Sequence, residues 1–395
     1  MNKTDRWLLP EGIEEVLPEQ AKRLEQLRRQ LLDTYDSWGY ELVIPPFIEY
    51  LESLLTGTGN DLDLQTFKLT DQLTGRLMGI RADMTPQVAR IDAHQLNRET
   101  PTRLCYIGTV LHTRNDGFAG SRSPLQVGAE LYGHAGIESD VEVMTLMLET
   151  LAMSGVEAPF VDLGHVGIYR ELVKQAGLDK EQEATLFDSL QRKANTEISA
   201  LLNDWKLDTK IANAIAALTR LNGDESIIAE AKTVLKSAGK GVHSALEELA
   251  SIAALLKMRC PKVEVHYDLA ELRGYHYHTG TVFAAYVPGR GQAVAQGGRY
   301  DDIGEVFGRA RPATGFSTDL KTLLSLSIHK NNQVAAIYAP ADNSPELQKV
   351  VSALRQQGEK VICALPNQSG SAKDMNCTRQ LVNDGSDTSW QVKDL

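Results

Sequence analysis

The stretch Leu125-Gln126-Val127-Gly128-Ala129-Glu130-Leu131-Tyr132 places an apolar residue at every odd-numbered position. Successive side chains of a strand point to opposite faces of a sheet, so this alternation predicts a strand with one buried face. The other face would carry Gln126, Gly128 and Glu130 together. We therefore expect a sheet whose polar side can hold a functional site.

The residues around this strand extend the prediction. A second strand is expected over Arg103 to Val110, joined to the first by a Gly- and Ser-rich loop over Asp116 to Pro124. A helix is expected from about Asp140 to Ser154. Ser139 and Glu142 fit the S-x-x-E pattern of a capping box at its start.

The N-terminal part combines a helix with further strands. Apolar residues recur at helical spacing from Pro18 to Trp38, and Gly39 follows at the expected C-terminal cap. A short strand over Glu41 to Ile44 should end at Pro45, because proline cannot continue a strand ladder. Another strand is expected over Arg76 to Arg81.

Helices and strands are grouped along the rest of the chain. Residues from about 167 to 258 are rich in Ala, Leu, Glu and Lys, which indicates a helical insertion. Strands are expected to return over 262–268, 281–287 and 292–296. This grouping favours an α+β domain on an antiparallel sheet, which we place at residues 1–329.

A short C-terminal segment has a different pattern. Within residues 330–395, a strand is expected over 334–338, a helix over 346–357 and a second strand over 360–364. Residues 370–395 are polar and weakly patterned. The segment is thus predicted to be a small, truncated α/β unit.

Composition limits the function classes. The chain has 395 residues and a net charge of −11, which disfavours broad binding of nucleic acid. No apolar run approaches the roughly 18 residues that span a bilayer, and Met1 to Leu9 does not resemble a signal peptide. The four cysteines form no C-x-x-C pair, so neither a zinc site nor a redox motif is indicated. We expect a cytoplasmic protein with no metal, no cofactor and no membrane contact.

Four blocks of sequence occur in an order that resembles histidyl-tRNA synthetase, a class II aminoacyl-tRNA synthetase. They cover about residues 10 to 325, and each is weak evidence on its own. The blocks are Gly39 to Pro46, Ile80 to Thr85 continuing through Tyr106-Ile107-Gly108 to Gln126–Glu130, Leu272 to Phe283, and Gly297-Gly298-Arg299-Tyr300-Asp301 followed by Gly315-Phe316.

This resemblance implies a class II synthetase-like antiparallel sheet flanked by helices, a dimer built on the first block, and a pocket for L-histidine. Asp83 would accept a hydrogen bond from the ammonium and Arg273 would bind the carboxylate. Gln126 and Glu130 would share the ammonium and the imidazole N–H between them. Taken singly, Glu130 is more often a solvated strand residue, Gln126 an ordinary sheet residue and Arg273 a surface cation. The complete implied histidine-binding set is Asp83, Thr85, Gln126, Glu130, Arg273, Tyr277, His278 and Tyr300.

The chain departs from the synthetase at the positions that hold ATP. The family reads F-R-x-E where this chain has Leu111-His112-Thr113-Arg114, and G-L-E-R where it has Asp319-Leu320-Lys321-Thr322. Adenylation needs fixed cations where charge develops on the phosphate. We therefore predict no catalytic residues and no adenylation chemistry. Asp83 and His278 also replace a family glutamate and tyrosine, which puts the fit of the imidazole pocket in question.

A chain that keeps the amino-acid pocket but lacks the ATP clamps and a full tRNA-binding domain resembles one family. This family is the regulatory subunit of the short-form ATP phosphoribosyltransferase. The resemblance implies a hetero-oligomer with the catalytic subunit of that enzyme, and activation and histidine feedback in histidine biosynthesis. The alternatives are an active class II ligase, a module that senses uncharged tRNA and, more remotely, a biosynthetic amide ligase.

Overall fold

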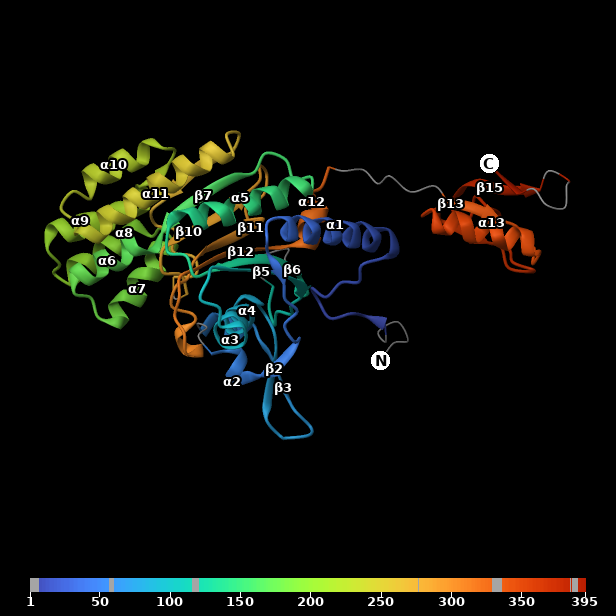
Figure 1. Ribbon diagram of the computed structural model, residues 1–395. Coiled ribbons are helices and arrows are strands. Elements are labelled where there is room, and N and C mark those ends of the chain that lie inside the picture. Colours follow the sequence, from blue (N-terminus) through green and yellow to red (C-terminus); the bar gives the residue numbers. More distant parts are fainter. Residues whose placement is uncertain are drawn as a thin grey trace. The chain divides into compact units, whose positions relative to one another are not determined.

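The computed structural model divides the chain into two compact units, Met1–Ile328 and His329–Leu395 (Figure 1). The predicted loop over Asp116 to Pro124 falls partly outside the part of the chain that the structure describes. The described residues are 7–56, 60–115, 121–275, 277–328, 336–383, 385 and 390–395.

A mixed, mainly antiparallel sheet forms the centre of the first unit. The β1–β5 and β7–β9 pairs are parallel, and the remaining neighbours pair antiparallel. In the described residues the sheet has the order β1 (Glu41–Leu42), β5 (Thr102–Thr109), β6 (Leu125–Tyr132), β12 (Ala313–Asp319), β11 (Ala295–Arg299), β10 (Thr281–Tyr286), β7 (Phe160–His165), β9 (Glu264–Asp268) and β8 (Asn222–Gly223).

The predicted division of β6 into two faces is confirmed, but the expectation that only one face is buried was wrong, because every residue from Val127 to Tyr132 is buried. Val127, Ala129 and Leu131 are buried in the main core together with the helix α5 (Ile137–Met153). The helices α1 (Pro18–Ser37), α11 (Lys240–Arg259) and α12 (Leu320–Leu326) complete this helical layer (Figure 1). The even-numbered β6 residues face the other way, towards a second cluster that contains Tyr106, Tyr132 and Met84.

The region expected to be a helical insertion is almost wholly helical. The insertion comprises α6 (Val166–Ala176), α7 (Lys180–Gln191), α8 (Asn195–Asp204), α9 (Thr209–Ala217), α10 (Ser226–Val234) and α11, with the short strand β8 between α9 and α10.

The longest helices, α1 and α11, have 20 residues each. Among the described helices, none is long and apolar enough to cross a membrane.

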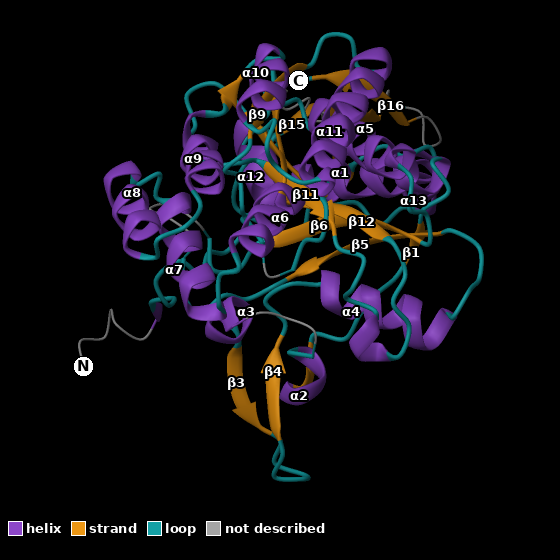
Figure 2. Cartoon of the chain, turned by 90° about the vertical axis from the view of Figure 1, so that its left-hand side faces the viewer, coloured by secondary structure: helices purple, strands orange, loops and turns teal. Residues whose placement is uncertain are grey.

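A separate three-stranded sheet lies beside the main one. The predicted strand over Arg76 to Arg81 belongs to this sheet, and the β3–β4 hairpin stands out from the body of the unit (Figure 2). Its strands are β2 (Ile48–Tyr50), β4 (Leu77–Ile80) and β3 (Phe67–Thr70), accompanied by α2 (Leu51–Leu54), α3 (Asn60–Gln65), α4 (Thr85–Arg90) and a π-helical turn over Ile91–Leu96.

Two local predictions were wrong. The helix α5 begins earlier than expected and is capped by Gly136, so Ser139 lies in its first turn and donates to the Gly136 carbonyl at 2.7 Å. Glu142 cannot close a capping box, because it is the sixth residue of the helix and not the third. Its carboxylate instead pairs with Arg103 at 2.6 and 2.9 Å. The strand expected over 292–296 is instead β11, a few residues later.

The second unit is a four-stranded sheet with one helix in the described residues. Its core contains Ile337, Leu347, Val351 and Leu381. The strands have the order β14 (Val361–Cys363), β13 (Ala336–Ala339), β15 (Cys377–Asn383) and β16 (Trp390–Asp394), and the helix is α13 (Pro345–Gln356). The last two strands were not predicted, because most of their exposed positions are polar and only Cys377 and Leu381 are buried.

Candidate functional site

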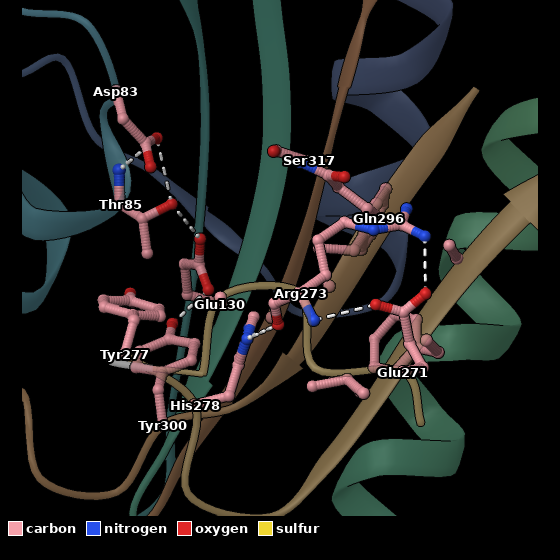
Figure 3. A pocket seen from close by; sticks show the side chains of 17 residues that line it. Asp83, Thr85, Glu130, Glu271, Arg273, Tyr277, His278, Gln296, Tyr300 and Ser317 are labelled. Atoms are coloured by element: carbon pink, nitrogen blue, oxygen red, sulfur yellow. Dashed lines mark hydrogen bonds and ion pairs between the residues drawn. The ribbon is translucent and has the colours of Figure 1, made fainter. Parts of the chain in front are cut away.

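A cavity of about 150 Å³ lies over the strands β6, β10, β11 and β12. Seven of the eight predicted ligand residues line it (Figure 3). The eighth, Gln126, donates a hydrogen bond to Asp83, one of the seven. The complete lining is Asp83, Thr85, Glu130, Glu271, Arg273, Gly274, Tyr277, His278, Val282, Phe283, Ala284, Gln296, Gly297, Tyr300, Gly315, Phe316 and Ser317.

Glu130 forms the buried end of the cavity. Its side chain accepts hydrogen bonds from the hydroxyls of Tyr106, at 2.8 Å, and Tyr300. The hydroxyl of Thr85 lies 3.2 Å from Glu130 Oε1 and equally far from Asp83 Oδ1, so its one hydrogen can serve only one carboxylate. Burial raises the pKa of the Glu130 carboxyl to about 8. The Glu130 carboxyl can therefore hold a proton near neutral pH, or accept a hydrogen bond from an N–H group of a ligand.

Two glycines create the space that this cluster occupies. A Cβ atom at Gly315 would lie 1.5 Å from Glu130 Oε2, and one at Gly128 would lie 2.5 Å from the Tyr106 hydroxyl. Both residues sit on strands directly beside the carboxylate. The glycine within Gln-x-Gly-x-Glu therefore makes room for Tyr106, a residue that the sequence analysis quoted but did not assign to the pocket.

Asp83 marks the second acidic position. Its Oδ1 accepts from the Thr85 amide at 3.0 Å and from Gln126 Nε2 at 2.7 Å. The amide oxygen of Gln126 accepts from the Met84 backbone N–H at 3.0 Å. Gln126 therefore lies behind Asp83 and orients its carboxylate, instead of lining the cavity as we expected.

Aromatic rings form one wall of the cavity. Tyr277 stacks on Tyr300 with the ring centroids 4.9 Å apart. The Tyr277 hydroxyl is buried and has no hydrogen-bond partner among the described residues. Leaving a buried hydroxyl unpaired costs about 1–3 kcal/mol, so a polar atom of a ligand at this place would be favourable.

His278 contributes a neutral imidazole to the same wall. Burial lowers the pKa of its ring to about 4. Its Nδ1 lies 3.2 Å from the Arg273 carbonyl oxygen, which can only accept, so Nδ1 carries the hydrogen. Nε2 is left as an acceptor. His278 thus fixes the loop that carries Arg273 without adding charge.

Arg273 supplies the cation at the other end of the cavity. Its Nη2 donates to Glu271 Oε2 and to the Tyr286 hydroxyl, both at 2.6 Å. Glu271, Gln296 and Ser317 also line this end, and the sequence analysis predicted none of them. The sequence indicated Glu271 only through its position, two residues before Arg273, which we expected to bind the ligand carboxylate.

The two positions expected to have lost ATP-binding arginines make local contacts. His112 Nε2 donates to the Ala82 carbonyl at 2.8 Å, and the Thr322 hydroxyl donates to Asp319 Oδ2 at 2.8 Å. Asp319 at the same time caps α12 through the backbone N–H groups of Lys321 and Thr322. Neither position carries a planar, permanently charged guanidinium.

Family models match both units. The model described as histidyl-tRNA synthetase matches residues 12–323. The model described as the ATP phosphoribosyltransferase subunit HisZ C-terminal domain matches residues 334–393. The two matched segments fall inside the two compact units of the chain.

Relatives match over the whole length. An ATP phosphoribosyltransferase regulatory subunit from Thioalkalivibrio sulfidiphilus is 63% identical and covers 100% of both chains. One from Nitrosococcus oceani is 56% identical over 99% of this chain and 98% of its own.

Solved structures share the fold. A Bacillus halodurans protein titled ATP phosphoribosyltransferase regulatory subunit/histidyl-tRNA synthetase superposes with a TM-score of 0.83 at 27% identity, covering 93% of this chain and 95% of its own. A histidyl-tRNA synthetase from Nostoc reaches a TM-score of 0.78 at 18% identity, covering 98% and 94%. At 18% identity, the similarity to the Nostoc protein is evidence for a shared fold only.

Proposed function

The chain belongs to the family of ATP phosphoribosyltransferase regulatory subunits, and from this premise we propose that it is a non-catalytic subunit that binds L-histidine in the described pocket. In this proposal the bound histidine feeds back on a separate catalytic subunit, with which the chain forms a hetero-oligomer. The ligand-binding domain is residues 1–329, and residues 330–395 form a small separate domain.

One observation carries the choice of ligand: the lining of the cavity combines acidic side chains with a guanidinium. Asp83 can accept from the ammonium group of histidine, and Arg273 can donate to its carboxylate. Glu130, at the buried end, and the unpaired hydroxyl of Tyr277 can bond to the two imidazole nitrogens. Each polar group of the amino acid thus has a matching group in the pocket.

The regulatory effect would follow from linkage. A ligand shifts an equilibrium between two assembly states only by the difference between its affinities for them. A self-associating core would also fit this role, and exposed apolar side chains at Leu42, Ile44 and Ile48 support a dimer built on β1 and the following segment. A two-fold dimer would present its remaining surfaces in pairs, which favours even stoichiometry.

The experiment is a steady-state assay of phosphoribosyl-ATP synthesis by the catalytic subunit. Rates are measured with and without this chain, and with and without L-histidine. We expect the chain to change turnover or substrate affinity about 5-fold or more, and histidine to oppose that change. Equal rates in all four conditions, together with separate elution of the two proteins, would contradict the proposal.

The second candidate is an active ligase that makes histidyl-adenylate. The retained pocket and the synthetase fold favour it. The contacts of His112 and Thr322 count against it, since removing a single preorganised donor typically costs about 10²–10³ in rate. Exchange of pyrophosphate into ATP that depends on histidine and magnesium would support the ligase; we expect only background exchange.

A further inference from the structure

We propose that Glu271 determines which ligands the pocket accepts. By balancing the charge of Arg273, Glu271 would make the pocket bind a free zwitterionic amino acid and exclude the same amine when it carries a phosphate. This inference rests on the proposed function, because it concerns the same histidine pocket.

Glu271 holds Arg273 at two points. Its Oε2 accepts from Nη2 of the guanidinium at 2.6 Å, and its Oε1 accepts from the Arg273 backbone N–H at 2.8 Å. Both side chains line the cavity, and Figure 3 shows the two contacts between them. The carboxylate therefore fixes where the arginine is and supplies a counter-charge within hydrogen-bond distance.

The backbone around Glu271 is shaped to receive this side chain. A Cβ atom at Gly164 on the neighbouring strand β7 would lie 2.9 Å from the Cβ of Glu271, so only glycine leaves enough room. The Glu271 amide donates to the Asp268 carbonyl at 3.1 Å, which fixes the turn after β9. The Glu271 side chain is only 16% exposed, which limits screening of its charge by water.

The remaining donors of Arg273 suit one carboxylate. Among the described residues, Nε and Nη1 of the guanidinium have no hydrogen-bond partner. The two groups point to different edges of the guanidinium, so a ligand carboxylate can accept from one of them. Such a carboxylate adds one negative charge, and the ammonium of the same ligand offsets that charge beside Asp83. A zwitterion therefore leaves the charge of the pocket unchanged.

A phosphate at the same place creates an imbalance. A phosphomonoester carries about −1.5 to −2 charges at pH 7. Arg273 already shares its charge with Glu271, so the added charge would repel the Glu271 carboxylate in a partly buried site. Rejection through a like charge is a common way to set specificity. This repulsion by Glu271 would exclude phosphorylated ligands in addition to the loss of the ATP-binding arginines at His112 and Thr322.

The test compares L-histidine with L-histidinol phosphate, which keeps the imidazole and the ammonium but replaces the carboxylate with a phosphate ester. Calorimetry is performed on the full chain, alone and assembled with the catalytic subunit, for the wild type, Glu271→Gln and the exposed control Glu264→Gln. We expect the wild type to bind histidine and to bind the phosphate poorly. In Glu271→Gln the affinity ratio should shift towards the phosphate by about tenfold or more, with no shift in the control.

Each outcome has one meaning. If the wild type binds no histidine in either form, the proposed function fails, and with it the basis of this inference. If it binds histidine but the ratio is unchanged in Glu271→Gln, the role of Glu271 is wrong while the histidine site stands. Glutamine keeps the shape and one acceptor oxygen, and a thermal melt of the variant reports whether it is folded.

Discussion

The Tyr300 hydroxyl donates a hydrogen bond to Glu130, a residue 170 positions earlier in the chain. This contact joins the loop after β11 to the strand β6 at the buried end of the cavity. Four described side chains meet at this point: Thr85, Tyr106, Glu130 and Tyr300. The strength of ligand binding should therefore depend strongly on the one carboxylate they share.

We predict that Glu130→Ala weakens histidine binding by about ten- to a hundredfold, because a buried polar group of the ligand left without its partner costs about 1–3 kcal/mol. Calorimetry of the assembled complex measures the effect. Glu264→Ala, at an exposed position of β9, is the matched control and should leave the affinity unchanged. Unchanged affinity in a folded Glu130→Ala variant would rule out this site.

Glu130 should also make stability depend on pH. The pKa of its carboxyl is about 8 in the folded chain, above the ordinary value of 4.5, so the folded state holds the proton more tightly. Its stabilising contribution is complete below about pH 4.5 and is lost as the pH rises through about 8. Urea unfolding between pH 5 and about 9 should show the wild type losing stability relative to Glu130→Gln, by a few kcal/mol. Parallel curves for the two proteins would contradict this assignment.

A buried ion pair between the sheet and α5 provides a prediction about stability. Arg299 Nη2 donates to Asp140 Oδ2 at 2.8 Å and to the Ser139 hydroxyl at 2.9 Å, and both members of the ion pair are buried. Removing one partner strands a buried charge, so Asp140→Ala should lower the free energy of unfolding by about 3–5 kcal/mol. The exposed pair Arg192–Asp188 is the comparison, and Asp188→Ala should cost less than about 1 kcal/mol. If urea unfolding shows similar losses of unfolding free energy for Asp140→Ala and Asp188→Ala, the proposed difference between the buried and the exposed ion pair is wrong.

Much of the fold could be predicted because its signals are local. The spacing of Leu27, Leu31 and Tyr35 predicts α1, and the alternation along β6 assigns Val127 to the core and Glu130 to the polar face. The strand β12 was missed, because its first four residues are all buried and show no alternation. The strand β7 was missed because its alternation covers only Phe160 to Leu163 before two further buried residues. The strand β8 has only two residues, too few for any periodic signal.

The cavity-lining residues were predicted from the family resemblance and not from residue type alone. Seven of the eight residues implied by the resemblance line the cavity. The positions of Gln126 and Glu271 depended on partners that sequence does not show. Gln126 is turned behind Asp83 by two hydrogen bonds, and Glu271 reaches the cavity because the distant Gly164 leaves room for it.

The response to histidine should depend on Arg273. If the guanidinium binds the ligand carboxylate, Arg273→Ala should raise the histidine concentration needed for half of the regulatory effect by about ten- to a hundredfold. Assembly with the catalytic subunit should persist, since the hydrogen bonds of Arg273 within the described residues go to Glu271, Tyr286 and His278, which all lie near the cavity. The measurement is a histidine titration of phosphoribosyl-ATP synthesis, with co-elution of the two proteins as the check on assembly.

Controls separate loss of the ligand contact from damage to the loop. Arg273→Ala leaves the Glu271 carboxylate without its cation, so the double variant Arg273→Ala/Glu271→Ala is measured beside it. Both should show the same blunted response if the missing carboxylate contact is the cause. The exposed Arg220→Ala should respond like the wild type. A full response in the double variant would show that the stranded carboxylate, and not the lost ligand contact, explains the single variant.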